Sequence, residues 1–522
     1  MSSVLSRKKT ALVNRHGLVL MIALIALAGA AKTIICDTID PDSFWHLRVG
    51  EQLLNDGIGP LNDSISYSSI REPWTPYSWL CEIGMLKLWQ FGGFRLAIAA
   101  TAMCVAGFIV MMAFSCIELQ KYAMDNGPAE ALRDRQFQFS VVLATAFGTF
   151  LSLPFLSFRP VTFCLFILSI CFSLIVRDRR ILEKTKSVWL TIPLAAFLIN
   201  IHLFAVLIPI WFFALLLGAT WERIFNGDPE WMHEFNRSIK RYGIMFLMSA
   251  LACCLTPMLP GLLLAVGHYT LHDPMVASTV IGEMRPFYSG GMGKISLALV
   301  LYFALCMLQN QRRMRLGEII ILLISAAFLL WKGRMSPVFA IAAAPAFSVV
   351  MPRLHDRVLA KRPVQVCMLL VLSMGIFRTA EAFPNSKTQF SAWLNRNGAD
   401  CPGYPTKSAE FVSNRIEKRT GRIINEFNWG GYLAWELKSD FKVLLDGRTQ
   451  VFAPQFWSDV YLNDGDQRRK VLAESGADVA IVPIDKSRFR ATLVQMGWKS
   501  IHRDDRAEVL VPAERFVGMD VD

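Results

Sequence analysis

Long apolar runs separated by short polar connectors fill the first 380 residues of the chain. A membrane-spanning helix needs about 20 mostly apolar residues. The runs predict about eleven spans, although several runs are short and ten or twelve spans fit as well. They lie at roughly 17–36, 94–116, 138–155, 160–176, 187–202, 203–221, 242–265, 295–308, 316–332, 336–351 and 364–380. The pattern therefore predicts a polytopic α-helical membrane protein.

The pattern changes from about residue 385 onwards. Short apolar runs typical of strands appear in GRIINEF, FKVLLDGR, ADVAIVPI, WKSIH and AEVLVP. Between them, GGYLAWEL, DQRRKVLAES and RFRATLVQMG have the spacing of amphipathic helices. Strands and helices in alternation predict a small α/β domain with a mostly parallel sheet. We therefore divide the chain into a membrane domain at 1–384, whose first outer loop is 37–79, and an α/β domain at 385–522.

Charged residues support the division and orient the chain. Charged residues make up 18% of the sequence, below the roughly 25% of a soluble domain. The net charge is +12, but Lys and Arg lie in short clusters between the spans, which argues against nucleic-acid binding. If the N-terminus is cytoplasmic, the inner connectors carry 23 Lys or Arg and the outer ones carry 6. This asymmetry, with eleven spans, predicts a C-terminal domain on the outer face. In a Gram-negative cell that face is the periplasm, and the protein would lie in the bacterial inner membrane.

This orientation places a set of polar residues on the outer face. They are Asp37, Asp40, Asp42, His46, Arg48, Asp63, Glu82, Arg159, Asn200, His202, Glu283, Arg285, Lys332 and Arg334. Connectors are polar in general, and a cation at the end of a span such as Lys332 can simply extend towards water. Arg159 and His202 lie in connectors of only a few residues, at the membrane edge. Polar groups there usually face a cavity or a partner.

The segment DPDSFWHL carries the most informative chemistry. Asp40 and Asp42, separated by a rigid proline, can act as a metal-binding pair or as a general base. A structural reading is also open, in which Asp42 caps a helix that begins SFWHLRVGEQLL. The two readings are compatible. The apolar positions of this helix fit one face, and we expect Phe44 and Trp45 to dip into the bilayer surface.

An acidic pair followed by FWHLRVG, GIGPLNDSISYS and EPWTPYSWLCE resembles the first outer loop of the GT-C glycosyltransferases. These polytopic enzymes take sugars from polyprenyl-phosphate carriers. Their relatives include protein O-mannosyltransferases, lipid A aminoarabinose transferases and the bacterial RgtA/B/C/D-like or family-39-like set. Further similar motifs are FRPVTF, NIH, LTPMLPG, IGEMRPF, GRMSPVFAIAAAP, FNWGGYLAW and LLDGR, so the resemblance extends over nearly the whole chain.

The resemblance implies roles for particular residues. Asp42, with Asp40 second, matches the acid that serves as base or binds a metal or the acceptor, and Glu283 matches a second acid. Cationic residues that would hold the carrier phosphate are Arg159, Arg334 and Arg285. The remaining candidate ligands are His202, Asn200 and His46. The resemblance implies no obligatory cofactor. It leaves open a divalent cation, Mg²⁺ or Mn²⁺, bound by Asp40 and Asp42. The segment DSFWHL departs from the Asp-Glu pair of the O-mannosyltransferases, so the acceptor cannot be carried over.

The sequence thus predicts a membrane glycosyltransferase that moves a sugar from a polyprenyl-phosphate carrier to a glycan, lipid or protein acceptor, with inversion. A lipid-linked glycan transporter is an alternative, but it would show charges deep within spans and two similar halves. Lys32 is the one clear charge within a span, and no repeat is seen. A second alternative is an inactive scaffold whose C-terminal domain binds a partner. In that domain, Asp446 and Arg448 of LLDGR are read mainly as a turn and a salt bridge.

Overall fold

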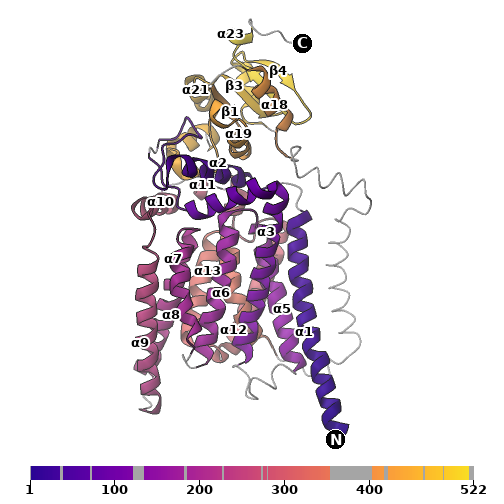
Figure 1. Cartoon of the computed structure of the whole chain (residues 1–522), viewed down its shortest axis with the longest axis vertical. Helices are drawn as coiled ribbons and strands as arrows, with labels where there is room; N and C mark the ends of the chain where they lie inside the picture. Colours follow the sequence, from indigo (N-terminus) through magenta and orange to yellow (C-terminus); the bar gives the residue numbers. More distant parts are fainter. Residues whose placement is uncertain are drawn as a thin grey trace.

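The computed structural model describes residues 2–35, 39–70, 73–121, 134–181, 185–225, 229–271, 274–278, 280–352, 403–416, 421–462, 465–485 and 487–516. A long bundle of helices carries a smaller α/β domain over one end, with the first outer loop between them (Figure 1). The fold class expected from the sequence is confirmed. The boundary expected at 384/385 lies outside the described residues, and so do Asp37 and the expected span at 364–380.

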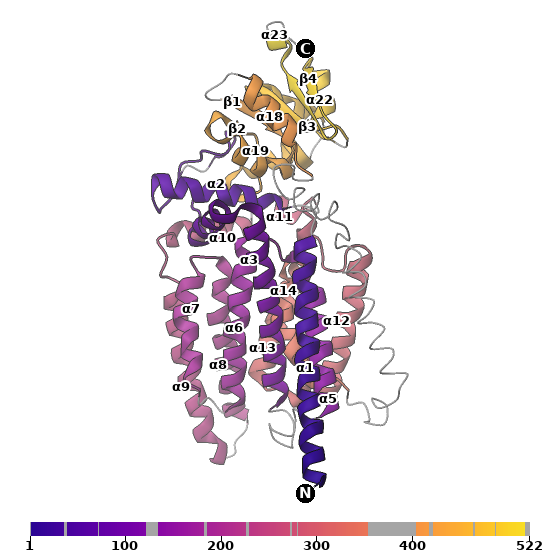
Figure 2. The same ribbon diagram turned by 45° about the vertical axis from the view of Figure 1, so that its right-hand side comes forward.

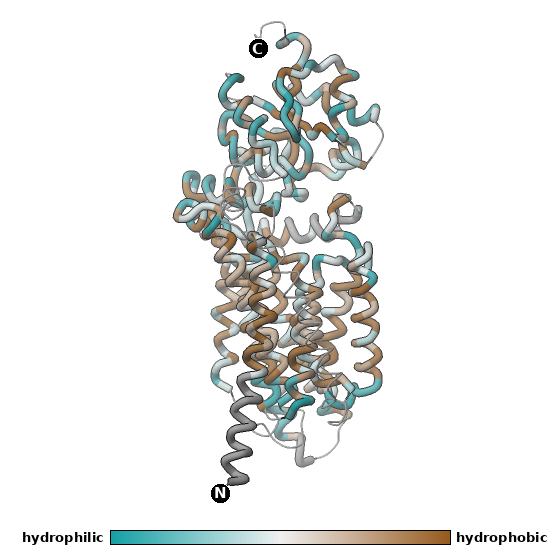
Figure 3. Tube along the Cα trace, turned by 90° about the vertical axis from the view of Figure 1, so that its right-hand side faces the viewer, coloured by the Kyte–Doolittle hydropathy of each residue, from teal (hydrophilic) through white to brown (hydrophobic). Residues whose placement is uncertain are grey.

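The helices of the bundle follow the predicted spans. Their bounds are α1 Ser2–Ile35, α3 Trp79–Lys121, α5 Arg135–Ser152, α6 Pro160–Arg180, α7 Thr191–Leu198, α8 Leu207–Phe225, α9 Pro229–Ala252, α12 Gly290–Asn310, α13 Leu316–Trp331 and α14 Ser336–Val350. Among the described residues, 7 helices are long and apolar enough to cross a membrane. Hydrophobic residues dominate the middle of the bundle, whereas hydrophilic residues gather at its far end and in the C-terminal domain (Figure 3). The chain is therefore a membrane-embedded protein.

Helix packing places one element at the centre of the bundle. Every residue of α14 is buried, and this helix lies among α3, α5 and α13 (Figure 2). Small side chains let it approach its neighbours closely, since its sequence is SPVFAIAAAPAFSVV. A Cβ added at Gly148 of α5 would lie 2.9 Å from Cβ of Ala344, which shows how close the two helices are. Small residues at such contacts are typical of membrane helices.

Two of the differences between predicted spans and observed helices have a clear local cause. We expected a span at 242–265, but α9 ends at Ala252 and α10 begins at Leu259. Between them, Pro257 cannot donate a backbone hydrogen bond and disfavours helical geometry at the residue before it. The second difference is α3, which begins upstream of the predicted 94–116 and is kinked where Gly93 takes φ 58°. Glycine adopts such a backbone conformation without steric cost.

The kink divides α3 into two parts. All 43 residues would extend over about 65 Å, twice the thickness of a bilayer core. Only the part after Gly93 runs along the bundle, whereas residues 79–91 cross its end beneath α2, Pro41–Asp56 (Figure 1). We therefore take residues 94–121 as the membrane-spanning segment. Glu82, near the start of α3, lies outside that segment.

All five expected strands and all three expected helices of the C-terminal domain are present. The strands are β1 Gly421–Asn425, β2 Phe441–Val443, β3 Val479–Pro483, β4 Lys499–Arg503 and β5 Ala507–Val511. The helices include α18 Thr406–Arg415, α19 Gly430–Glu436, α21 Gly465–Glu474 and α22 Arg490–Gln495. The strand order is β2-β1-β3-β5-β4.

The prediction of a mostly parallel sheet was wrong for one half of the sheet. Strands β2, β1 and β3 are parallel, but β5 runs antiparallel to both β3 and β4. The connection between β4 and β5 is too short for the crossover that a parallel pair requires. Asp504 fixes this turn, because its Oδ1 accepts hydrogen bonds from the backbone N–H groups of Arg506 (2.7 Å) and Ala507 (2.8 Å).

Helix α2, Pro41–Asp56, joins the bundle to the C-terminal domain. The ring of Phe44 packs edge-on against Tyr404 and Tyr432, with centroids 5.0 and 5.1 Å apart. Trp45 is likewise buried. The expectation that Phe44 and Trp45 enter the bilayer was therefore wrong, because Tyr404 and Tyr432 of the C-terminal domain cover Phe44, and Trp45 lies beside Asp42 and Gly447.

Candidate active site

A cavity of about 160 Å³ lies where the bundle, the first outer loop and the C-terminal domain meet. One part of its lining is polar and comprises Asp42, His46, Tyr77, Ser78, Arg159, His202, Arg334 and Gln450. The other part is largely apolar and comprises Trp45, Pro160, Val161, Leu203, Phe204, Trp331, Met335 and Gly447. Charged groups and an apolar surface thus share one cavity at the end of the membrane bundle.

Arg159 holds the acidic candidates together. It is the N-cap residue of α6, and Pro160 in the first turn fixes the start of that helix. Its guanidinium bonds Asp42 Oδ2 at 3.1 Å and both carboxylate oxygens of Glu283 at 3.2 and 2.9 Å. Its Nε lies 3.2 Å from Asp40 Oδ2. Acids from two connectors that are far apart in sequence therefore converge on one buried cation in a third connector.

Asp40, rather than Asp42, caps α2. The Asp40 side chain accepts a hydrogen bond from the backbone N–H of Asp42 at 3.0 Å. Pro41 occupies the first helical position, which suits its fixed φ, so the residue before it becomes the cap. The other Asp40 oxygen accepts a hydrogen bond from Ser157 Oγ at 2.9 Å. The prediction that Asp42 caps this helix was wrong, and its carboxylate is left to face the cavity.

Asp42 is held by two donors. Its Oδ1 accepts a hydrogen bond from Trp45 Nε1, and its Oδ2 accepts one from Arg159, each at 3.1 Å. Burial and the neighbouring Asp40 raise the pKa of Asp42 to about 6, although Arg159 opposes this shift. Asp42 is therefore ionised at neutral pH, yet it is a stronger base than an exposed aspartate.

Glu283, in the 3₁₀ turn Gly282–Met284, remains ionised. Burial raises its pKa, but Arg159 and Arg334 outweigh that effect and lower it to about 2. Arg334 Nη1 lies 3.9 Å from Glu283 Oε1. Neither Glu283 nor Asp40 is among the residues that line the cavity, whereas Arg159 is. Arg159 thus lies between the cavity and Glu283.

Two other candidates lie apart from the cavity. Asn200 accepts a hydrogen bond from Trp79 Nε1 (2.8 Å) and donates to the backbone oxygens of Ala196 (2.8 Å) and Leu255 (3.0 Å). These contacts tie together three segments at this end of the bundle, which is a structural role. The exposed Arg285 is not part of the cavity lining, and its backbone oxygen accepts a hydrogen bond from Gly333 N at 3.1 Å.

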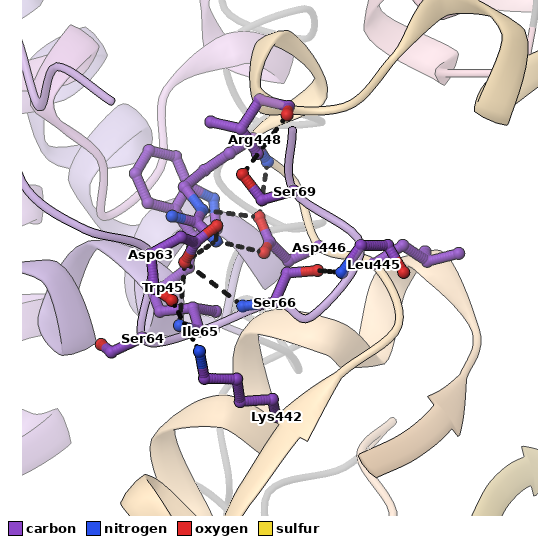
Figure 4. Close-up of polar contacts among 12 residues, drawn as sticks. Trp45, Asp63, Ser64, Ile65, Ser66, Ser69, Lys442, Leu445, Asp446 and Arg448 are labelled. Atoms are coloured by element: carbon purple, nitrogen blue, oxygen red, sulfur yellow. Dashed lines mark hydrogen bonds and ion pairs between the residues drawn. The ribbon is translucent and has the colours of Figure 1, made fainter. Parts of the chain in front are cut away.

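The LLDGR segment joins the two halves of the molecule (Figure 4). Arg448 is completely buried and bonds Asp446 Oδ2 at 2.7 Å and both carboxylate oxygens of Asp63 at 3.1 Å. Its guanidinium also lies over the ring of Trp74, 4.7 Å from the centroid. The expected turn and salt bridge are present, but Asp63 belongs to the first outer loop. The motif therefore fixes the C-terminal domain to that loop.

This connection brings the C-terminal domain to the cavity. A Cβ added at Gly447 would overlap with Oδ1 of Asp42 and lie 2.8 Å from Nε1 of Trp45. Gln450, one turn further, also lines the cavity. The sequence reasoning missed both residues. The glycine between the two charges of LLDGR was an available signal, since glycine is used where backbone approaches another group closely.

The residues present do not readily fit a metal ion. Each oxygen of Asp40 and Asp42 already has a donor within the protein, supplied by backbone N–H, Ser157, Trp45 or Arg159. In the ranges that the structure describes, no three His, Cys, Asp or Glu side chains come together as metal ligands do. A divalent cation would have to share these oxygens with the guanidinium of Arg159 and the other donors. We therefore derive no step through one, and metal dependence stays a prediction that chelation of divalent cations tests.

No protein-family model matches the chain, and a search of the curated proteins finds no match. Among solved structures, ArnT from Cupriavidus metallidurans in the apo state is similar, with 12% identity over 98% of this chain and 99% of that one and a TM-score of 0.47. ArnT bound to undecaprenyl phosphate is similar too, with 13% identity over 97% and 99% of the two chains and a TM-score of 0.46. The archaeal oligosaccharyltransferase AglB from Archaeoglobus fulgidus gives 12% identity over 90% of this chain and 69% of that one, with a TM-score of 0.45. These similarities concern the course of the chain alone.

Proposed function

We propose that this protein is a membrane glycosyltransferase that moves a sugar from a polyprenyl-phosphate carrier to an acceptor hydroxyl. One observation carries the proposal. A single cavity at the end of the bundle combines a basic carboxylate, Asp42, with two arginines and an apolar surface. The arginines suit a phosphate, the apolar surface suits an isoprenoid chain, and the carboxylate suits the removal of a proton.

The reaction is a single displacement. The acceptor oxygen attacks the anomeric carbon, and the bond from that carbon to the carrier phosphate breaks. The phosphate leaves with the bonding electron pair, and Arg334 and Arg159 stabilise its growing negative charge in a poorly solvated cavity. The proton of the acceptor hydroxyl passes to Asp42. Attack from the side opposite the leaving group inverts the anomeric carbon.

We also propose that the protein lies in the inner membrane, with its N-terminus in the cytoplasm and the cavity and C-terminal domain in the periplasm. The support is the distribution of Lys and Arg between the predicted connectors, 23 inside and 6 outside. Alkaline phosphatase fused to the C-terminus should then be active, and a cytoplasmic fluorescent reporter at the same point should be dark. The opposite pattern would place the cavity on the wrong face for this function.

Arg334→Ala should lower the affinity for undecaprenyl phosphate by about tenfold or more, because a charge-assisted hydrogen bond to phosphate is lost. Arg334→Lys should restore only part of it, since an ammonium group cannot bind phosphate in the bidentate way of a guanidinium. Binding can be measured with the purified protein in nanodiscs. Arg159 is a less direct test, because its guanidinium already bonds Asp42 and Glu283 and pairs with Asp40.

Lys332→Ala is the matched control. Lys332 carries the same charge two residues away in the same connector, but it does not line the cavity. Its loss should leave lipid affinity within about twofold of the wild type. Equal affinity in the wild type and in Arg334→Ala would mean that Arg334 is only an interfacial cation, and the phosphate site would have to lie elsewhere.

A further inference from the structure

Two histidines, the buried His46 and the half-buried His202, line the cavity without a part in the mechanism above. In His202, Nδ1 accepts a hydrogen bond from the backbone N–H of Phe204 at 3.2 Å. An imidazole that accepts at Nδ1 carries its proton on Nε2. Burial, followed by Arg334 and Arg159, lowers the pKa of His202 to about 3, so the ring is neutral. His202 therefore presents an uncharged N–H donor.

His46 is held in a similar way by a carboxyl group. Its Nδ1 lies 3.0 Å from Oε1 of Glu82, which is 1% exposed. The second oxygen, Oε2, is buried and has no hydrogen-bond partner in the described part of the chain. An ionised carboxylate would leave a charged oxygen there without a donor, which is costly. A protonated Glu82 that donates from Oε1 to Nδ1 leaves only a carbonyl oxygen unpaired.

The charges around the pair agree with this neutral state. Burial raises the pKa of Glu82 to about 8, although Arg448 opposes the shift. Burial, with Arg159, His202 and Arg448, holds the pKa of His46 well below its usual value. The other titratable groups that face the pair are Asp42, Tyr77 and Cys81. Burial raises the pKa of both Tyr77 and Cys81, so neither loses its proton near neutral pH.

The contact with Glu82 determines which ring nitrogen of His46 carries the proton. With Nδ1 accepting from Glu82, the proton of the neutral ring is on Nε2. His46 is 7% exposed, and Nε2 makes no hydrogen bond to any residue that the structure describes. The cavity therefore receives two uncharged N–H donors, one from His46 and one from His202, beside the guanidinium of Arg334.

We propose that the Nε2–H groups of His46 and His202 donate hydrogen bonds to the phosphate oxygens of the carrier, and that Glu82 is the positioning residue that sets the direction of the His46 donor. This rests on the proposed function, because it assigns the phosphate subsite of the same cavity. When Glu82 loses its proton, it becomes an acceptor, and the His46 proton moves from Nε2 to Nδ1. Nε2 then presents a lone pair to the phosphate, and the two repel each other.

The test compares undecaprenyl phosphate affinity at pH 7 and pH 9 in wild type, Glu82→Gln and Glu82→Leu. Wild type should bind about tenfold more weakly at pH 9, as expected for the loss of one hydrogen bond to a charged group. Glu82→Gln should show a pH 7 to pH 9 ratio near one, because its amide donates to Nδ1 at both pH values. Glu82→Leu should bind about tenfold more weakly already at pH 7, since nothing then fixes the ring.

Glu51→Gln is the control, because Glu51 lies on α2 like His46 but outside the cavity lining. It should keep the alkaline loss of affinity that wild type shows. An unchanged alkaline loss in Glu82→Gln would overturn the assignment, and so would wild-type affinity in a folded Glu82→Leu. If wild type does not bind undecaprenyl phosphate at pH 7, the proposed function itself fails, which is a distinct outcome.

Discussion

Asp42→Asn should lower the rate of glycan transfer by about 10²-fold or more, the loss expected when a general base is removed. The amide keeps the shape of the carboxylate, and its single oxygen can still accept one of the two hydrogen bonds that Trp45 and Arg159 donate to Oδ1 and Oδ2 at 3.1 Å. It cannot accept a proton at neutral pH. Because Asp40 caps α2, the substitution leaves the helix start intact, and folding should change little. The measurement is the extent of envelope glycan modification at matched protein levels in the membrane.

Asp56→Asn is the matched control for this substitution. Asp56 ends the same helix, is exposed and accepts a hydrogen bond only from the Gln52 side chain among the contacts that the structure describes. The same chemical change there should leave activity close to that of wild type. Full activity in Asp42→Asn would remove this carboxylate from the reaction.

The pH dependence of glycan transfer is a second test of Asp42 as the general base. A base must be unprotonated to work, and the pKa of Asp42 is raised to about 6. Activity in membrane vesicles should therefore fall as the pH drops below about 6, because the fraction of ionised Asp42 falls. The residual activity of Asp42→Asn should lack this acid limb.

Gly447→Ala should lower turnover by about 10²-fold while the protein still folds. The added Cβ would overlap with Oδ1 of Asp42 and lie 2.8 Å from Nε1 of Trp45. The carboxylate must therefore move, and a misplacement of about 1 Å in a catalytic group can cost this much. Undecaprenyl phosphate affinity should change less than turnover, because Arg334 is untouched. Transfer and lipid binding can be measured on the same preparation.

Gly465→Ala is the matched control for that change. Gly465 opens α21 in the same domain, and a Cβ there would meet nothing within 4 Å. It should leave turnover unchanged. Wild-type turnover in Gly447→Ala would mean that Asp42 can shift freely without loss, and its proposed role would be contradicted.

The periodicity of the sequence was enough to predict which helices and strands exist, but not where they begin, end or bend. Strands such as β1 and β3 were predicted because short apolar runs between turns have few alternatives. The cap of α2 could have been read from Pro41, which favours the first helical position. The kink at Gly93 was harder to foresee, because a glycine within an apolar run is common in membrane helices.

The sequence predicted which polar residues lie on the same side of the membrane, but not the contacts that these residues make with one another. The charge pattern brought Asp42, Arg159 and Glu283 to the same side, and the structure places them around one guanidinium. The sequence could not show that Glu82 pairs with His46, because 36 residues separate them and the contact depends on the packing of α2 on α3. Burial of Phe44 was missed for the same reason, since its partners lie in the C-terminal domain.

The most direct test of the central claim is a cryo-electron microscopy map of the wild-type protein in nanodiscs with undecaprenyl phosphate. The account predicts density for the phosphate within hydrogen-bond distance of Arg334, beside Asp42. The isoprenoid chain should lie along the apolar surface that includes Val161, Leu203 and Trp331. A phosphate bound elsewhere on the molecule, or a cavity without lipid at saturating concentration, would contradict the assignment of this cavity as a glycosyl-transfer site.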